Sequence, residues 1–485
     1  MTGIEFTDFT GNPDIEIEGL AYNSKEIRPG YLFIALKGNT LDGHNFVEEA
    51  IRKGASAVVM EKIMPIHPSI SFIIVPNSRN AMSKLSAKFY RYPFEKINLT
   101  GITGTNGKTT TSYILESILQ SSGAKPGVIG TINYRFPGHT IAAPITTPES
   151  LDLMQILRRM ANAGVTDVVI EVSSHALQQG RVRDCPFKTA IFTNLTRDHL
   201  DYHGSMENYF QAKSRLFMGL KKRSQGDATA IINTDDPKGK ELAKLVCKNV
   251  VTYGLKDTCN IKAKMIRAGR TGIIAKLVMP SGETEIHSPL IGKFNIYNIL
   301  AAAAAAYSMG IDMEAIKTGI SRLEHIPGRL EMVKNSQSLT IVVDYAHTPD
   351  ALDKVLKALR PLVSGRIITL FGCGGDRDSG KRYEMGRVAG TLSDMVFITT
   401  DNPRTEDPYS IASQVKKGVQ DVLNGSRCIV DLDRKSAIKR AVKTIDKNDL
   451  LLIAGKGHED YQIIGKHKKN FDDRIVAMKA AAERI

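Results

Sequence analysis

The stretch Gly104-Thr105-Asn106-Gly107-Lys108-Thr109-Thr110 decides the fold. It follows an apolar run at residues 97–102 and precedes a helical pattern at 112–120, so we predict a strand, a glycine-rich turn and a helix in succession. In such a turn the glycines let backbone N–H groups curve around phosphate, the lysine reaches the outer phosphates, and a hydroxyl binds Mg²⁺. The stretch therefore predicts a nucleotide site on a parallel sheet, with a chance Gly-Lys-Thr turn as the alternative.

Further apolar, β-branched runs alternate with helical patterns along the chain. They lie at residues 168–172, 190–192, 341–343, 367–371, 395–399 and 450–454. This alternation is typical of βαβ units and predicts an α/β fold with parallel sheets. Polar, Gly- or His-containing residues follow nearly every run, and open α/β sheets bind ligands outside the carboxyl ends of their strands. We therefore expect the functional residues at these strand ends.

The chain has 485 residues, 42% of them hydrophobic, which is enough for about three domains that each bury a core. Its five cysteines are never closer than twelve residues apart, which argues against a disulfide framework or a zinc ribbon. The N-terminus lacks the basic and apolar regions of a signal peptide. The longest apolar stretch, residues 299–307, is mostly alanine and predicts a tightly packed helix. We expect a cytoplasmic protein without a membrane span.

The net charge of +14 could attract nucleic acid, anionic lipid or small polyanions. Residues 1–100 carry no net charge, so the excess is spread over the last two thirds of the chain without a long basic run. The short basic segment at 466–469 is expected to be a solvated loop. Scattered charge, no Trp and only 6% aromatic residues argue against a nucleic-acid-stimulated NTPase, which stays a remote alternative.

The glycine spacing departs from the strict P-loop pattern, because Ile102 stands where that pattern needs glycine. With this departure, GTNGKTT resembles the ATP loop of the Mur ligases and their folylpolyglutamate synthetase relatives. Other motifs of that family follow in order: EVSSH at 171–175, TNLTRDHLDYH at 193–203, Lys213 in QAKSRLF, GKFNIYN ending at 298, PGR at 327–329 and DYAHTP at 344–349. The resemblance covers essentially the whole chain.

This resemblance implies three domains. Residues 1–97 would bind UDP, residues 98–325 would form a central P-loop-type ATPase domain with a parallel sheet, and residues 326–485 would form a Rossmann-like domain that binds an amino acid. It implies a monomeric cytoplasmic ligase of peptidoglycan synthesis that uses ATP and Mg²⁺. ATP would phosphorylate the D-glutamyl carboxylate of UDP-N-acetylmuramoyl-L-alanyl-D-glutamate, and an amine would attack the acyl phosphate.

The metal site can be argued in part from the residues. Glu171 ends a buried run, where an unpaired carboxylate would be costly, so we predict Mg²⁺ held by Thr109 and Glu171, with a salt bridge to a lysine as the alternative. The resemblance adds His199 as a ligand of a second Mg²⁺. It also implies that Lys213 is carbamylated to N6-carboxylysine and bridges metal, so that Lys108, Lys213 and His199 are the expected catalytic residues.

The resemblance assigns the remaining nucleotide contacts. The adenine and ribose end of ATP would contact Asn298, Arg329, Asp344 and His347, although the Pro-Gly-Arg segment by itself also fits an ordinary interdomain linker. The UDP moiety would contact Tyr22, Ser24, Asn39, Thr40 and Leu41, in segments that in isolation fit surface turns. The muramoyl dipeptide would contact Thr146, Thr147, Ser173, Gln179 and Arg181.

The segment DNPR at 401–404 bears on which amino acid is added. Meso-2,6-diaminopimelate has a distal carboxylate that suits a guanidinium fork and a distal ammonium that suits a carboxylate. DNPR resembles the recognition motif of diaminopimelate-adding members of the family. The expected diaminopimelate contacts are Arg382, Asp401, Asn402, Pro403, Arg404, Gly455 and Glu459. Two alternatives remain open: Arg404 pairs with Glu406 or Asp407 on the surface, or the chain is a lysine-adding or folylpolyglutamate-type ligase.

Overall fold

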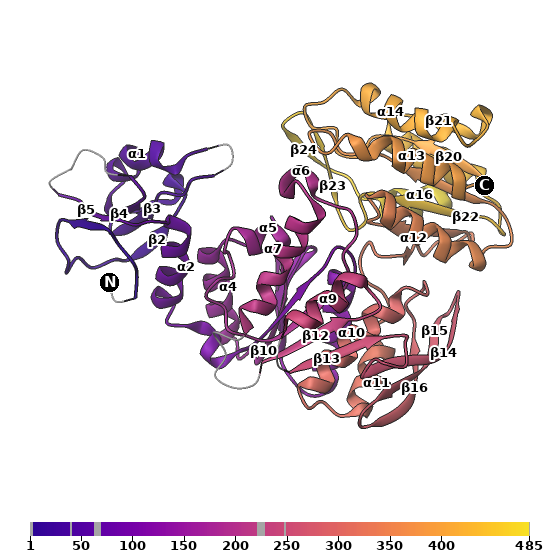
Figure 1. Cartoon of the computed structure of the whole chain (residues 1–485). Helices are drawn as coiled ribbons and strands as arrows, with labels where there is room; N and C mark the ends of the chain where they lie inside the picture. Colours follow the sequence, from indigo (N-terminus) through magenta and orange to yellow (C-terminus); the bar gives the residue numbers. More distant parts are fainter. Residues whose placement is uncertain (1–2, 39–40, 63–68, 221–227, 247–248, 485) are drawn as a thin grey trace.

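The computed structural model describes residues 3–38, 41–62, 69–220, 228–246 and 249–484. Its helices and strands alternate along the chain and form successive bodies from the N-terminus (indigo) to the C-terminus (yellow) (Figure 1). The described strands form sheets of 5, 11, 6 and 2 strands, and the core of each large sheet is parallel. The predicted α/β class is confirmed. No helix among the described residues combines the length and the apolar character needed to cross a membrane.

The first sheet has the strand order β1-β5-β4-β3-β2, with β1 antiparallel and the other strands parallel. Its strands are β1 (Asp8–Thr10), β2 (Gly19–Ala21), β3 (Tyr31–Ile34), β4 (Ala55–Met60) and β5 (Ser71–Ile74). Its helices are α1 (Val47–Arg52) and α2 (Ser78–Phe89), with 3₁₀ turns at Ser24–Glu26, Gly43–Phe46 and Pro93–Lys96. The side chain of Asn77 caps α2 by accepting from the Asn80 amide.

The central sheet has eleven strands in the order β16-β15-β14-β13-β12-β11-β6-β10-β7-β8-β9. The strands are β6 (Asn98–Thr103), β7 (Pro126–Ile129), β8 (Asn133–Phe136), β9 (His139–Ala142), β10 (Asp167–Glu171), β11 (Phe187–Phe192), β12 (Thr229–Asn233), β13 (Val250–Gly254), β14 (Ile261–Gly269), β15 (Gly272–Met279) and β16 (Gly282–Ser288). The helices are α3 (Lys108–Ser121), α4 (Ser150–Asn162), α5 (Ser174–Gln178), α6 (Leu200–His203), α7 (Met206–Met218), α9 (Pro237–Leu245), α10 (Asn295–Ser308) and α11 (Met313–Arg322).

Strand β6 lies between β10 and β11, and both neighbours run parallel to it. The register pairs Ile102 with Glu171 and Thr103 with Phe192, so the three strands end at one edge of the sheet. The segment 104–110 follows β6 at that edge. The strand order therefore places the glycine-rich turn at the middle of the sheet, beside the ends of two other strands.

Helix α3 begins at Lys108, four residues before the helix expected from the sequence. Gly107 is its N-cap residue, with φ +88°. The first turn carries the hydroxyl residues Thr109, Thr110 and Thr111, so the apolar periodicity that reveals a helix starts only afterwards. This earlier start puts the lysine and both loop threonines at the helix N-terminus, where backbone N–H groups are unpaired.

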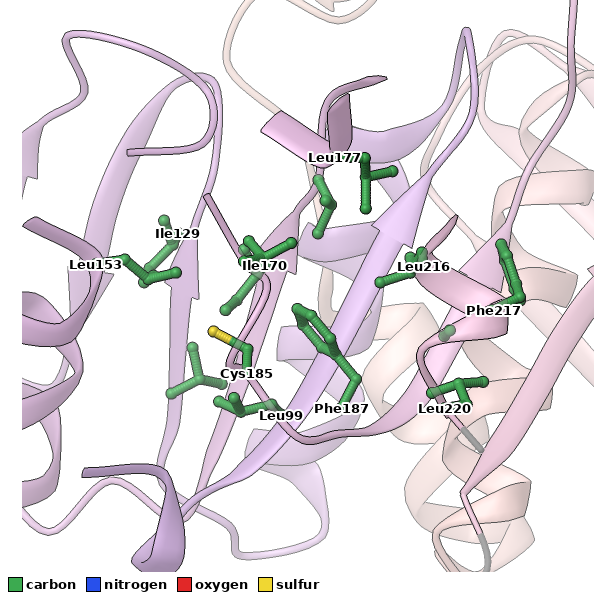
Figure 2. Packing of buried hydrophobic residues seen from close by; sticks show 14 of the residues in the cluster. Leu99, Ile129, Leu153, Ile170, Leu177, Cys185, Phe187, Leu216, Phe217 and Leu220 are labelled. Carbon is green, nitrogen blue, oxygen red and sulfur yellow. The ribbon is translucent and has the colours of Figure 1, made fainter. Parts of the chain in front are cut away.

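The central sheet buries apolar side chains on both faces. Leu99 and Ile170 point to one face, where they pack with Phe187 and with residues of α7 (Figure 2). Ile102 points to the other face, where α3 and α10 pack. The alanines at 301–306 of α10 are fully buried there, which confirms the expected tightly packed helix. Because both faces are covered, ligands are expected at the carboxyl edge of the strands.

The third sheet has the order β17-β18-β22-β19-β20-β21, parallel except for β17. The strands are β17 (Glu331–Met332), β18 (Thr340–Asp344), β19 (Ile367–Phe371), β20 (Met395–Ile398), β21 (Cys428–Val430) and β22 (Leu450–Ala454). The helices are α12 (Pro349–Leu359), α13 (Gly380–Leu392), α14 (Pro408–Gln420), α15 (Arg434–Thr444) and α16 (Asp473–Ala482), with 3₁₀ turns at Arg360–Leu362 and Gly425–Arg427. The DNPR segment follows β20, and residues 455–459 follow the central strand β22.

A two-stranded hairpin follows the third sheet, formed by β23 (Tyr461–Ile464) and β24 (His467–Asn470). The loop expected at 466–469 is therefore wrong as secondary structure, although β24 is exposed along its length. Charged residues on an edge strand carry no apolar alternation, which hides the strand in the sequence. The hairpin contributes to the site because the Arg404 amide donates to Ile463 O at 3.1 Å and the Gly465 amide donates to Arg404 O at 2.7 Å.

Candidate active site

The glycine-rich loop is shaped by two close approaches. A Cβ on Gly104 would lie 1.9 Å from Thr193 Oγ1, and one on Gly107 would lie 2.3 Å from Asn298 Oδ1. Only glycine fits such contacts, and both residues also have positive φ. The loop is held further by Asn106, whose amide donates to Asn194 Oδ1 at 2.9 Å and whose side chain donates to Asp350 Oδ2 at 2.9 Å.

Lys108 points back into the loop. Its Nζ donates to Gly104 O at 2.8 Å and to Thr105 O at 2.9 Å. Burial lowers the pKa of this ammonium, and the nearby Glu171 carboxylate opposes that effect. The Lys108 ammonium therefore donates to backbone carbonyls of the loop. A bound polyphosphate would replace these hydrogen bonds with stronger, charge-assisted ones.

Glu171 is surrounded by donors at the end of β10. Its Oε2 accepts from Thr109 Oγ1 at 2.9 Å and from Thr131 Oγ1 at 2.8 Å, and its Oε1 accepts from the Thr131 amide at 3.1 Å. The residue is 1% exposed, and the ion pairs among the described residues include none between Glu171 and a lysine. Carboxylate and hydroxyl oxygens are hard ligands that suit Mg²⁺.

These residues fit a magnesium ion that is shared with a nucleotide. Among the residues that the structure describes, no group of three or more His, Cys, Asp or Glu side chains converges as a metal site. Mg²⁺ commonly takes one or two protein oxygens and completes its shell with phosphate oxygens and water. Thr109 and Glu171 would supply the protein oxygens.

Lys213 lies beneath the same loop. It is 2% exposed, its Nζ donates to Gly104 O at 2.9 Å, and the ammonium stands 4.5 Å from the ring centre of Tyr209. Burial, with a further contribution from the Lys108 charge, holds the pKa of Lys213 well below its usual range. Burial thus favours the neutral form of this amine, and a neutral amine is a nucleophile.

His199 stands in a group of aromatic and titratable side chains beside the loop. Its φ is +54°, its ring lies edge-on to His175 at 4.9 Å, and its Nε2 lies 3.4 Å from Asp198. Desolvation lowers the pKa of His199 to about 4. The ring is therefore neutral near pH 7, as a metal ligand must be. The next histidine along the chain, His203, is buried, and its Nε2 is 2.9 Å from Ser174 Oγ.

A cavity of about 900 Å³ opens beside the glycine-rich loop, between the central and third sheets. Its lining includes Asn106, Gly107, Thr110, Asn298, Arg329 and Asp344. This volume lies within the range of small-molecule and nucleotide sites. Asp344 shapes the cavity wall, since it accepts from the Leu330 and Ala346 amides, both at 2.8 Å.

Arg329 and His347 are the other two predicted nucleotide residues of this region. Arg329, which lines the cavity, donates from Nη2 to Thr109 Oγ1 at 3.2 Å and so joins the Pro-Gly-Arg segment to the glycine-rich loop. The imidazole of His347 is bound through Nδ1 to Tyr345 O at 2.8 Å, and burial lowers its pKa. His347 is not among the residues that line the cavity.

The residues predicted for the muramoyl dipeptide form one network behind Glu171. Thr147 Oγ1 donates to Glu171 O at 2.8 Å and accepts from the Ser173 amide at 3.0 Å. Arg181 Nη1 donates to Thr147 O at 2.8 Å, and its Nε donates to Gln179 Oε1 at 3.0 Å. Thr146 joins through Thr131, with 3.2 Å between their hydroxyl oxygens.

The residues predicted for UDP are less closely joined. Tyr22 donates to Asp152 Oδ2 on α4 at 2.7 Å, so it lies at the contact between the first and central sheets. Ser24 donates to Glu49 Oε2 on α1 at 2.9 Å, and Leu41 is exposed. Asn39 and Thr40 lie outside the described residues.

The DNPR loop is hydrogen-bonded to neighbouring segments, and its arginine, Arg404, forms no ion pair among the described residues. Asn402 Nδ2 donates to Glu459 Oε2 at 2.9 Å. Arg404 Nη1 donates to Gly375 O at 2.8 Å, and Arg404 is half-buried. No ion pair of Arg404 occurs among the described residues, so the alternative pairing with Glu406 or Asp407 is absent there. Its guanidinium keeps donors free for a carboxylate.

Arg382 reaches this region but is already paired. Its guanidinium binds Glu406 through two hydrogen bonds of 2.6 and 2.7 Å, and its side chain is 1% exposed. The expected contact with an amino acid would require this pair to break. Arg377, which no motif in the sequence singles out, is exposed and has one hydrogen bond, to Asp376 O at 3.2 Å.

Comparison with known proteins places the chain in a family. The Mur ligase middle domain matches residues 102–306, the Mur ligase glutamate ligase domain matches 328–457, and the Mur ligase family catalytic domain matches 16–90. The UDP-N-acetylmuramoyl-L-alanyl-D-glutamate--2,6-diaminopimelate ligase of Geobacter metallireducens is 46% identical over 479 residues, which cover 96% of this chain and 94% of the relative. The chain belongs to the Mur ligase family.

Other Mur ligases agree with this placement. The ligase of the same name from Geobacillus kaustophilus is 44% identical over 476 residues, covering 98% of this chain and 96% of the relative. A solved structure of that name is 34% identical, with a TM-score of 0.67 and coverage of 96% and 95%. The MurF ligase of Thermotoga maritima in complex with ADP is 20% identical, with a TM-score of 0.63 and coverage of 97% of each chain, and shows the shared fold.

Proposed function

We propose that the protein is an ATP-dependent ligase that joins meso-2,6-diaminopimelate to the D-glutamate of UDP-N-acetylmuramoyl-L-alanyl-D-glutamate, in peptidoglycan precursor synthesis. The guanidinium of Arg404, which has no ion pair among the described residues, is the observation that supports this substrate most directly. It lies in the same DNPR segment as Asn402, which binds the carboxylate of Glu459. Lysine has no distal carboxylate and would leave that guanidinium unsatisfied. The relatives that match almost the whole chain carry the name of the diaminopimelate-adding enzyme, and no observation favours the lysine-adding alternative.

The first chemical step transfers the γ-phosphoryl group of ATP. A carboxylate oxygen of the D-glutamyl residue attacks the γ-phosphorus, the bond to the β-phosphate oxygen breaks, and ADP leaves. Lys108 exchanges its loop carbonyl partners for phosphate oxygens and stabilises the negative charge of the transferring group. Thr109 and Glu171 would hold Mg²⁺, which neutralises phosphate charge when bound. Catalysis thus depends mainly on position and electrostatics.

The second step forms the amide. The neutral α-amine of diaminopimelate attacks the acyl carbon, the carbon–oxygen bond to phosphate breaks, and the nitrogen loses a proton. Phosphate leaves with an oxygen that belonged to the D-glutamyl carboxylate. Water would hydrolyse the acyl phosphate, so the third sheet and its helices must cover the site during the reaction. The bond from Asn106 to Asp350 at the start of α12 already joins the two parts.

We further propose how the predicted domains share the substrates. Residues 1–97 bind the UDP moiety, residues 98–325 bind the phosphates of ATP and the muramoyl dipeptide, and residues 326–485 bind the amino acid and contribute further contacts to ATP. The ATP contacts are Gly104, Thr105, Asn106, Gly107, Lys108, Thr109, Thr110, Asn298, Arg329, Asp344 and His347. Such nucleotide substrates are cytoplasmic, and we propose that the protein works there as a monomer.

The amino acid contacts follow from which groups are free. Asp401, Asn402, Pro403, Arg404, Gly455 and Glu459 surround the proposed distal pocket. Arg382, held by Glu406, positions this loop, and Arg377 offers a second free guanidinium near Arg404. Arg377 lies close to the carboxyl end of β19, whereas Arg382 lies inside helix α13. Because ligands bind at strand ends, this position could have favoured Arg377 over Arg382 as the amino acid contact in the sequence.

Lys213 is proposed to carry a carbamate. Its neutral amine would attack CO₂ and release a proton, which converts a buried cation into an anion that can bind metal with His199. A Lys213→Ala variant should lose activity, and a small carboxylic acid should restore part of it. Full activity without any acid would contradict this role.

Labelled substrate tests the proposed chemistry. With ¹⁸O in the D-glutamyl carboxylate, the phosphate released during ligation should carry one ¹⁸O from that carboxylate. Label in AMP instead would indicate an acyl adenylate, and unlabelled phosphate would show that ATP hydrolysis is not coupled to carboxylate activation. A reaction without diaminopimelate is the control.

A further inference from the structure

Lys456 is a fully buried lysine at the base of the proposed amino acid pocket. It follows β22, and its side chain is 0% exposed. Its Nζ donates to Glu459 Oε2 at 2.8 Å and to Asn402 Oδ1 at 3.3 Å, and lies 4.0 Å from Asp401 Oδ1. It therefore contacts three proposed pocket residues without being reachable by the substrate itself.

The cost of burying this ammonium indicates that its charge has a use. A buried cation is expensive unless it is paired, and an apolar side chain of similar volume would often be as stable. Asn402 and Glu459 already join each other at 2.9 Å. Lys456 is thus not needed to bring these two residues together, but it adds one positive charge to the cluster formed by Asp401, Asn402 and Glu459.

The charges around the pocket can be counted. Asp401 and Glu459 are 10% and 15% exposed and carry two negative charges, of which Lys456 offsets one. A second buried cation, Arg434, binds Asp473 through two bonds of 2.7 Å, so this pair adds no net charge to the count. With Lys456 in place, the acidic side of the pocket has a net charge of about minus one, and the DNPR segment adds the guanidinium of Arg404.

We propose that Lys456 is a buried counter-charge that makes the pocket prefer an amino acid with a zwitterionic distal end over one with a cationic distal end. The inference rests on the proposed function, because it concerns selection at the same pocket. A distal carboxylate and ammonium together suit one net negative charge beside a guanidinium. Two uncompensated carboxylates would instead attract the lone distal ammonium of lysine. Lys456 acts through Asp401 and Glu459 and is a positioning residue.

Two neutral substitutions test the charge separately from packing. Lys456→Met keeps the length of the apolar chain, and Lys456→Gln keeps a hydrogen-bond donor. In both variants the ratio of kcat/KM for meso-diaminopimelate to that for L-lysine should fall by roughly tenfold to a hundredfold, because one unit charge near the distal group is removed. The KM values for ATP and the UDP substrate should stay the same. A ratio that stays at the wild-type value in both variants would overturn the inference.

The matched control is Lys439→Met, which removes a partly exposed lysine paired with Glu483 at 2.7 Å in the same domain. It should leave the ratio unchanged, and a change of similar size would show that the effect is not local. Adding Asp401→Asn to Lys456→Met restores the net charge and should move the ratio back toward wild type. If Lys456 had only a structural role, its substitution would lower kcat/KM for both amino acids by the same factor and leave their ratio unchanged.

A measurement on the unaltered enzyme covers the case in which the variants fail to fold. Binding of 2-aminopimelate, which has a distal carboxylate only, should be tighter than binding of L-lysine, which has a distal ammonium only. Tighter binding of lysine would refute the charge count. Failure of wild-type enzyme to ligate diaminopimelate would refute the proposed function instead, so the two failures can be told apart.

Discussion

Replacing Arg404 with methionine removes the guanidinium that we assign to the distal carboxylate. Arg404 has φ +53°, and methionine also carries a Cβ, so the backbone strain is unchanged. The guanidinium forms hydrogen bonds of 2.8 Å to Gly375 O and 3.5 Å to Asn402 O, and no ion pair of the described residues is lost. The variant should therefore fold, with a free energy of unfolding lowered by about 1.5–3 kcal/mol for the lost hydrogen bond to Gly375 O.

The size of the effect follows from the bond that is lost. A hydrogen bond to a charged group contributes about 1.5–3 kcal/mol, which corresponds to roughly tenfold to a hundredfold in kcat/KM. Only an amino acid with a distal carboxylate forms this bond. The loss should therefore fall on meso-diaminopimelate, and kcat/KM for L-lysine should change little.

The assay measures ADP release with saturating UDP-dipeptide and ATP, for each amino acid and each variant. Thermal unfolding of the same samples shows whether stability has changed. An equal loss for both amino acids, or no loss for diaminopimelate, would refute the assignment of Arg404. Arg382→Met is the contrasting variant: it breaks a buried pair with Glu406, so it should lower stability and affect both amino acids alike.

Three further outcomes are expected. Arg434→Met leaves the carboxylate of Asp473 buried without its partner and should lower the free energy of unfolding in urea by about 3–5 kcal/mol. Glu149→Gln weakens the ion pairs of Glu149 with Arg181 (3.1 Å) and Arg79 (2.9 Å) and should raise KM for the UDP substrate by roughly tenfold in steady-state assays, while KM for diaminopimelate stays constant. Desolvation lowers the pKa of His203 to about 4 in the folded protein. As the pH falls, His203 is therefore protonated in the unfolded chain before it is protonated in the folded protein, which favours unfolding. Stability should drop between about pH 6.5 and 4, by at most about 1.4 kcal/mol per pH unit for this group, and less steeply in His203→Gln.

Each of these outcomes has a clear opposite. An Arg434→Met variant as stable as wild type would show that the buried pair is not required. A change in KM for diaminopimelate in the Glu149→Gln variant would show that this ion pair affects the amino acid site, and would refute its assignment to the UDP-substrate site. An unchanged acid slope in His203→Gln would assign that slope to other groups, such as His458, whose pKa desolvation lowers to about 3.

The sequence predicted strands β6, β10 and β11 of the central sheet and β18, β19, β20 and β22 of the third, because buried parallel strands are short apolar runs between helical patterns. It did not predict the other central strands, β7 to β9 and β12 to β16, or strands β17 and β21. The strand runs at 367–371 and 450–454 match β19 and β22 in full. The same reasoning placed the glycine-rich loop at a strand end. It missed the start of α3 and strand β24, where polar residues carry no hydrophobic period.

The site was harder to predict, because the state of a side chain depends on residues distant in sequence. Arg382 and Arg377 lie five residues apart, and only the three-dimensional structure shows that Glu406 engages the first and leaves the second exposed. Lys456 gave no signal in the sequence, since a lysine between glycines usually indicates a solvated loop. Its burial follows from the meeting of β20, β22 and the β23–β24 hairpin.

The proposed reaction joins diaminopimelate to the D-glutamyl carboxylate through an amide at the expense of ATP. Amino acid-dependent ADP release with UDP-N-acetylmuramoyl-L-alanyl-D-glutamate measures this reaction, with the nucleotide product identified by mass. We expect one ADP per tripeptide formed with meso-diaminopimelate, and a kcat/KM for L-lysine lower by roughly a hundredfold or more. Equal or better use of lysine, or ADP release without ligation, would refute the proposed reaction.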